Sequence, residues 1–164
     1  MNIPHTDRLK QLAKQKESEN KKLFGRLKIK RPSNLDHLVA GIHDEVFSEI
    51  NCLNCANCCK TLGPRLIQKD IERLSKFLHL KKDVFTDKFL RMDEDGDYVF
   101  RSVPCPFLLA DNSCLVYEHR PKACADYPHT NRRKFHQVLD LTLKNTFVCP
   151  AAFEIVEKLK LNLK

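Results

Sequence analysis

The chain has 164 residues, of which 42% are hydrophobic and 30% are charged. This composition is typical of a globular domain and excludes a disordered or fibrous protein. No run of 18 apolar residues is present, and the first residues lack the apolar core of a secretion signal. We therefore expect a cytoplasmic protein without a membrane segment.

The positive charge is concentrated at one end of the sequence. The formal net charge is +8, and residues 1–31 hold ten Lys or Arg against three Asp or Glu. We expect residues 1–31 to be a basic N-terminal arm that packs little, and residues 32–164 to be a cysteine-cluster metal-binding domain. The arm is interpreted first as a solvated helix that maintains solubility, and alternatively as an anchor on nucleic acid or another anionic surface.

The first half of the chain predicts helices. Residues 6–24 are rich in Lys, Gln and Glu and predict a polar helix. After a break at Arg31-Pro32, apolar residues recur at helical spacing over 34–50, with Ser33 expected as the N-cap and Asp36 completing a capping box. Two further helices are expected over 67–79 and from Asp83 to about residue 90.

The second half predicts shorter elements. A strand is expected over 98–103, a hairpin or two short extended arms over 107–117, a helical turn within 120–127 and a closing helix over 151–161. The pattern over 138–143 fits a strand or a helix equally well. The expected fold class is mainly α with a small β hairpin, in one compact domain that a metal organises and that carries the basic helical arm.

Eight cysteines are the unusual feature of the composition. The first four are Cys52, Cys55, Cys58 and Cys59, which form two overlapping Cys-x2-Cys pairs and an adjacent thiol. This spacing is found in zinc knuckles and in iron–sulfur proteins. Cys58 and Cys59 are neighbours, so we expect their side chains to diverge.

The other four cysteines are dispersed at Cys105, Cys114, Cys124 and Cys149. The eight together form either two four-ligand sites or one such site with several structural thiols; disulfides are a less favoured alternative. His119, His129 and His136 lie near enough in sequence to complete a site. We predict at least one thiolate site that joins 52–59 to 105–124, with all eight cysteines as candidate metal ligands.

The order of the motifs resembles the YkgJ-like cysteine-cluster family, described as a zinc- or iron-chelating domain. The resemblance rests on Cys52-x2-Cys55-x2-Cys58-Cys59, Pro104-Cys105-Pro106, Cys114-Leu115-Val116-Tyr117, Arg120-Pro121 and Cys124, within about residues 50–150. Ala125 stands where the family often has Arg. A similar cluster in flagellin lysine-N-methylases is associated with an iron–sulfur cluster, but no Gly-rich nucleotide loop of a methyltransferase is present here.

Three functions remain open from the sequence. The favoured one is a protein that binds zinc or iron through thiolates, with no reaction identified and no catalytic residue assigned. The alternatives are an iron–sulfur redox or modification-enzyme component, and a metal-stabilised nucleic-acid-binding module that uses the basic arm. Residues 131–134, Asn-Arg-Arg-Lys, are also able to contact phosphate, although a solvated loop is favoured. The expected partner is a metal ion; no protein partner is identified.

Overall fold

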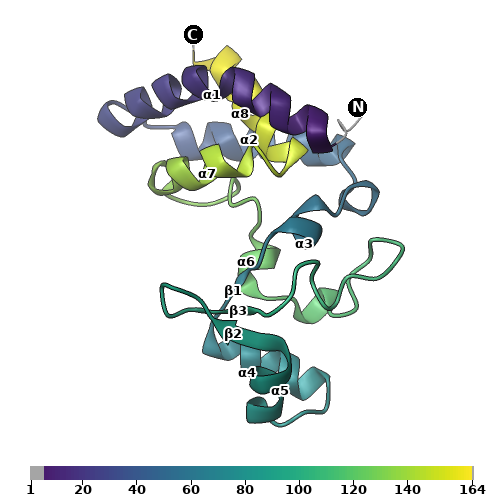
Figure 1. The fold of residues 1–164 in the computed structure, drawn as a ribbon. Coiled ribbons are helices and arrows are strands. Elements are labelled where there is room, and N and C mark those ends of the chain that lie inside the picture. The colour runs from purple at the N-terminus through teal and green to yellow at the C-terminus, as the bar shows by residue number, and fades with distance from the viewer. Residues whose placement is uncertain (1–5, 164) are drawn as a thin grey trace. The chain divides into compact units, whose positions relative to one another are not determined.

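The computed structural model describes residues 6–163, which fold into two compact units (Figure 1). Unit 1 contains the chain up to Cys52 together with the chain from Pro128 onward, and unit 2 contains Leu53–Tyr127. Unit 2 is therefore inserted between the two halves of unit 1 in the sequence. No helix in the described part of the chain has the length and apolarity that crossing a membrane requires.

Unit 1 is helical. Its elements are α1 (Thr6–Ile29), α2 (Leu35–Glu49), the 3-10 turn η3 (Phe135–Val138), α7 (Leu139–Asn145) and α8 (Pro150–Asn162). Helix α8 packs against α2, and α1 packs against both α7 and α8. The pattern over 138–143, which fitted a strand or a helix, is thus helical.

Helix α1 contributes to the core of unit 1, so the expectation that the basic arm packs little is wrong for the described residues. Leu9, Ala13, Leu23, Phe24 and Leu27 are each at most 4% exposed. The last three lie in one core cluster with residues of α2, α7 and α8. Helix α1 has an apolar face despite its many charged residues, because a few apolar residues at helical spacing are enough to line one side of a long helix.

The start of α2 differs from the predicted cap. The residue before the helix is Asn34, and no side chain caps it. The Asp36 carboxylate, expected to complete a capping box with Ser33, accepts hydrogen bonds from the backbone N–H groups of Lys134 (2.6 Å) and Phe135 (3.0 Å) instead. Asp36 therefore joins two segments that are about a hundred residues apart in sequence.

Unit 2 combines short helices with a small sheet. Its elements are α3 (Asn57–Thr61), β1 (Arg65–Leu66), α4 (Gln68–Phe77), α5 (Lys82–Phe89), β2 (Leu90–Met92), β3 (Tyr98–Phe100), the 3-10 turn η2 (Tyr117–His119) and α6 (Lys122–Ala125). The 3-10 turn η1 (Cys52–Asn54) leads into it from unit 1. The three strands are antiparallel in the order β1-β3-β2 (Figure 1).

The core of unit 2 contains several aromatic side chains and includes residues of the sheet strands and of helices α4 and α5, which pack together. Phe85, Phe100 and Phe107 are at most 3% exposed. The predicted hairpin is reduced to one bridge between Leu108 and Cys114, with Leu109 N–H donating to the Ser113 carbonyl (2.9 Å). The fold class, mainly α with a small β component, is confirmed.

Candidate metal centre

Four cysteines of unit 2 come from four separate segments and share one electrostatic environment. Cys59 lies on α3, Cys105 follows Pro104, Cys114 lies at the bridge with Leu108, and Cys124 lies on α6. The charge of Cys59 raises the pKa of each of the other three thiols. We call these four residues the thiol cluster.

Backbone hydrogen bonds bring the first cysteine segment to the second. The N–H of Cys105 donates to the carbonyl of Cys59 at 2.8 Å. The side-chain amide of Asn112 donates to the carbonyl of Leu53, also at 2.8 Å. Backbone and side-chain hydrogen bonds therefore join residues 53–59 to residues 105–112, and the thiolate site expected between these segments stays a prediction.

The thiols of the cluster differ in their readiness to ionise. Burial, reinforced by neighbouring thiolate charge, raises the pKa of Cys105 to about 11 and of Cys124 to about 12. Burial also raises the pKa of Cys114. A hydrogen bond with the Cys58 thiol, 4.0 Å away between sulfurs, lowers the pKa of Cys59 to about 7, with a smaller contribution from the charge of Lys60. Three thiols are therefore neutral near pH 7, and Cys59 is the one poised to ionise.

Backbone N–H groups lie near two of the sulfurs. Those of Phe107 and Leu108 lower the pKa of Cys105 and that of Val116 lowers the pKa of Cys114, although in each case less than burial raises it. Donors two and three residues after a cysteine arise because the chain turns back over its own side chain. Such donors stabilise the charge that a thiolate ligand retains when it binds a metal.

Two cations offset charge at the cluster. The guanidinium of Arg120 lowers the pKa of both Cys114 and Cys124, although less than burial raises it. This guanidinium lies 3.9 Å from the Tyr117 ring centre and donates to the Tyr117 carbonyl at 2.7 Å. The Lys60 ammonium donates to the Cys55 carbonyl at 3.1 Å. Arg120 thus bonds a backbone carbonyl and offsets negative charge at two thiols of the cluster.

An ion pair between the buried Asp70 and the partly exposed Arg73 holds the loop between Cys114 and Cys124. Asp70, which is 1% exposed, accepts hydrogen bonds from Arg73 (2.7 Å) and from the N–H groups of Ile67 and Lys122 (3.1 Å each). Arg73 also donates to the carbonyls of His119 (3.2 Å) and Arg120 (2.8 Å). The sequence analysis missed Asp70 and Arg73; the signal available was an acidic residue in the first turn of a predicted helix, which is common to many helices.

The remaining cysteines have different positions. Cys58 neighbours Cys59 on α3, and Cys55 is half-buried just before that helix. Cys52 belongs to unit 1 and is exposed. Cys149 also belongs to unit 1, where its sulfur accepts the N–H of Ala152 at 3.5 Å at the start of α8 and packs against the core. Its contacts are those of a helix cap.

No three His, Cys, Asp or Glu side chains of residues 6–163 are arranged as a preformed metal shell. The ring of His119 stacks on Phe77, with centres 4.3 Å apart. The donor set of the thiol cluster nevertheless suits zinc or iron, because thiolates are soft ligands and no hard oxygen ligands accompany them. Three of the four thiols are partly buried and neutral near pH 7, which is the protonated state from which a metal displaces protons.

Comparison with known proteins gives one match. Residues 51–142 match the family model CxxCxxCC, described as "Putative zinc- or iron-chelating domain". The matched range includes all of the thiol cluster and the first cysteine group, and it leaves out Cys149 and helix α1. Neither a curated protein nor a solved structure matches the chain.

Proposed function

We propose that this chain, which belongs to the CxxCxxCC family of zinc- or iron-chelating domains, binds one metal centre through Cys59, Cys105, Cys114 and Cys124. The observation that carries the proposal is that four segments of one unit bring these thiols together: the N–H of Cys105 bonds to the Cys59 carbonyl at 2.8 Å, Cys114 lies at the bridge with Leu108, and Cys124 lies on α6. In addition to burial, the charge of Cys59 raises the pKa of the other three thiols. Four thiolates are the usual shell of a structural zinc site. They equally suit iron.

The surrounding residues support the chemistry of binding. A thiol must lose its proton to become a ligand, and burial opposes that loss at Cys105, Cys114 and Cys124. A divalent cation reverses this preference, because it replaces the proton with a larger positive charge. Four thiolates around one divalent ion leave a charge of −2, which Arg120, Lys60 and the N–H groups near the sulfurs of Cys105 and Cys114 offset. Metal binding should therefore order the loops that carry the ligands, and ordered loops should in turn bind the metal more tightly.

The second possibility within this proposal is an iron–sulfur centre in a redox or modification enzyme. Cys58, whose sulfur lies 4.0 Å from that of Cys59, and Cys55 provide further thiols beside the cluster. A cluster of iron and sulfide would absorb visible light, whereas zinc bound to thiolates would not. A visible absorption spectrum therefore distinguishes the iron–sulfur form from the zinc form.

The experiment is metal analysis and visible spectroscopy on protein purified without oxygen. We expect about one equivalent of zinc or iron per chain, and substantial loss of metal in each of Cys59→Ser, Cys105→Ser, Cys114→Ser and Cys124→Ser. Cys149→Ser is the matched control, since serine is also a good N-cap and should preserve α8. Full metal content in any of the four variants, or equal loss in Cys149→Ser, would contradict the proposed ligand set.

A further inference from the structure

Two basic segments that are far apart in sequence meet at one end of unit 1. One is the end of α1 with the residues that follow it, and the other is the loop 131–134. Asp36, at the start of α2, holds the second segment through the N–H groups of Lys134 and Phe135. Lys28 of α1 pairs with Asp140 of α7 at 2.7 Å, which fixes the end of α1 beside the helix that follows the loop.

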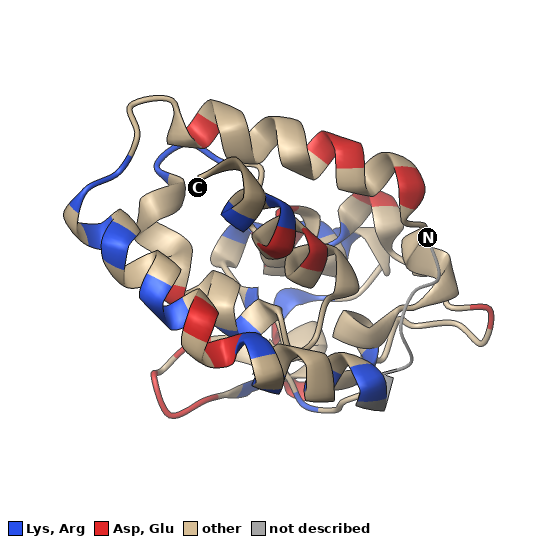
Figure 2. Cartoon of the chain, turned by 90° about the horizontal axis from the view of Figure 1, so that it is seen from above, with Lys and Arg blue, Asp and Glu red and all other residues tan. Residues whose placement is uncertain are grey.

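This arrangement produces a set of exposed cations that we call the cationic end. Its members are Arg26, Lys30, Arg31, Arg132, Arg133 and Lys134. In the part of the chain that the structure describes, none of these six side chains forms an ion pair, whereas the two nearby acids are engaged: Asp36 by backbone N–H groups and Asp140 by Lys28. Figure 2 shows Lys and Arg along α1, while α2 carries acidic residues alone. The positive charge at this end is therefore not neutralised within unit 1.

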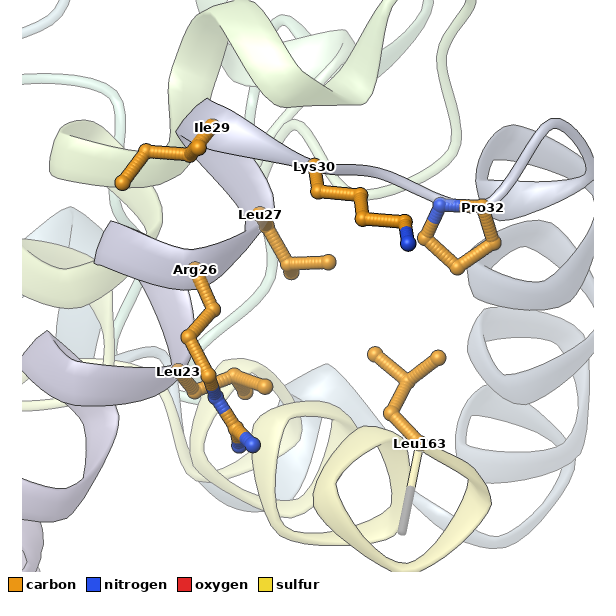
Figure 3. Close-up of a pocket in the computed structure, with 7 residues that line it drawn as sticks. All are labelled: Leu23, Arg26, Leu27, Ile29, Lys30, Pro32 and Leu163. Carbon is orange, nitrogen blue, oxygen red and sulfur yellow. The ribbon is translucent and has the colours of Figure 1, made fainter.

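The surface beside two of these cations, Arg26 and Lys30, is hollow and largely apolar. A recess of about 380 Å³ is lined by Leu23, Arg26, Leu27, Ile29, Lys30, Pro32 and Leu163. In Figure 3 the side chains of Leu27 and Leu163 point into this recess, and the Lys30 side chain runs along its rim toward Pro32. Leu23 and Leu27 form its buried floor, at 2% and 4% exposed.

We propose that the cationic end binds the phosphodiester backbone of a nucleic acid. Four of its six cations are arginines, whose planar guanidinium groups bind phosphate oxygens in pairs. None of the lining residues is aromatic, so the surface offers phosphate contacts without base stacking, which predicts binding with little sequence preference. The proposed surface includes residues of both basic segments, whereas the alternative considered from the sequence used residues 1–31 alone.

An anionic membrane is the less suitable partner for the same charges. An amphipathic helix that binds a membrane places apolar side chains in the lipid, in addition to the attraction of its cations to anionic headgroups. Here Ile29, 91% exposed, projects, but the leucines beside it are recessed on the floor of the hollow. Phosphate contacts with a nucleic acid need only the exposed cations.

Binding through six cations has a characteristic salt dependence. Each neutralised phosphate contributes a slope of about −0.7 for a single strand in a plot of log K against log salt concentration. Contact by all six cations predicts a slope of up to about −4. Reversing three of them should weaken binding at least about tenfold and reduce the magnitude of the slope by about 2.

The test measures fluorescence anisotropy of a labelled mixed-sequence RNA oligonucleotide and of a DNA duplex with the full chain. The variant is Arg31→Glu with Arg132→Glu and Arg133→Glu, which takes charges from both segments. The matched control is Lys69→Glu with Lys81→Glu and Arg91→Glu, three exposed cations of unit 2 that change the net charge by the same amount. Circular dichroism confirms that both variants fold.

We expect the triple variant of the cationic end to lose binding and the control to retain most of it. Equal weakening by the two variants would overturn the proposal, because binding would then follow net charge alone. Binding to phosphatidylserine vesicles or to a polyglutamate peptide without binding to either nucleic acid would also overturn it, in favour of a membrane or an acidic protein. The metal-free and metal-loaded forms should bind alike, so failure here is separable from failure of the metal site.

Discussion

The Asp70 carboxylate accepts a hydrogen bond from the backbone N–H of Lys122, which lies 52 residues later and begins α6. The N–H groups of the first turn of a helix have no partner within the helix, so a carboxylate at this position satisfies one of them. Asp70 is 1% exposed and is held by Arg73 at 2.7 Å. The short helix that carries Cys124 is therefore positioned by a side chain of α4.

The first prediction concerns this contact. Asp70→Ala should lower the free energy of unfolding of the metal-free protein by about 1–3 kcal/mol, because it leaves the N–H groups of Ile67 and Lys122 without their acceptor. It should also weaken zinc binding, measured by competition with a chromophoric chelator. The control is Asp126→Ala, which removes an exposed partner of Lys122 and should cost less than about 1 kcal/mol. Similar effects of both changes would contradict a positioning role for Asp70.

The second prediction concerns pH. In the reduced, metal-free protein the pKa of Cys59 is lowered to about 7 and that of Cys105 and Cys124 is raised to about 11 and 12, from a reference of 9.0. A lowered thiol pKa makes folding more favourable as pH rises from about 7 to 9. Raised thiol pKa values make it less favourable above about pH 9, since the unfolded chain then binds fewer protons than the folded one.

Urea unfolding from pH 6.5 to 10.5 therefore should show stability that rises and then falls. Cys124→Ala should reduce the fall above pH 9. A steady rise across this range in the unmodified protein would show that burial does not oppose ionisation of these thiols.

The third prediction concerns removal of the metal. Residues 103–116 have little regular structure beyond one bridge, so their order depends on few backbone hydrogen bonds. Chelation under reducing conditions should lower hydrogen-exchange protection over 105–124 while residues 38–48 of α2, packed in the core of unit 1, keep theirs. Unchanged exchange over 105–124 on metal removal would contradict a structural role for the ligands.

The fourth prediction concerns helix α1. Phe24 is 2% exposed in the core of unit 1, so Phe24→Ala should lower the free energy of unfolding by about 3–5 kcal/mol. Ile29 on the same helix is 91% exposed, and Ile29→Ala should change it by less than about 0.5 kcal/mol. Chemical denaturation of the two variants measures the difference. Equal free energies of unfolding for the two variants would contradict the packing of α1 in the core and support a detached arm.

The sequence by itself determined the elements whose signal is local. Apolar residues at helical spacing located α2, α4 and α8 to within a few residues, because the face a helix buries repeats along its own sequence. The order of the cysteine and proline motifs over about residues 50–150 likewise identified the family of metal-chelating domains, since that order is read along the chain. Helix α1 was located as a helix for the same reason, but its packing was misjudged.

Only the tertiary structure decided which distant residues meet. A backbone hydrogen bond joins Cys59 to Cys105, and the Asp70 carboxylate caps a helix that begins 52 residues later. The Asp36 carboxylate bonds to the N–H groups of Lys134 and Phe135 instead of forming a capping box in its own helix. A carboxylate or a thiol has the same chemical character whether its partner is local or distant, so the sequence does not define which residue it contacts. The partner is fixed when the chain buries its apolar faces, and the free energy of that burial is shared over the whole unit.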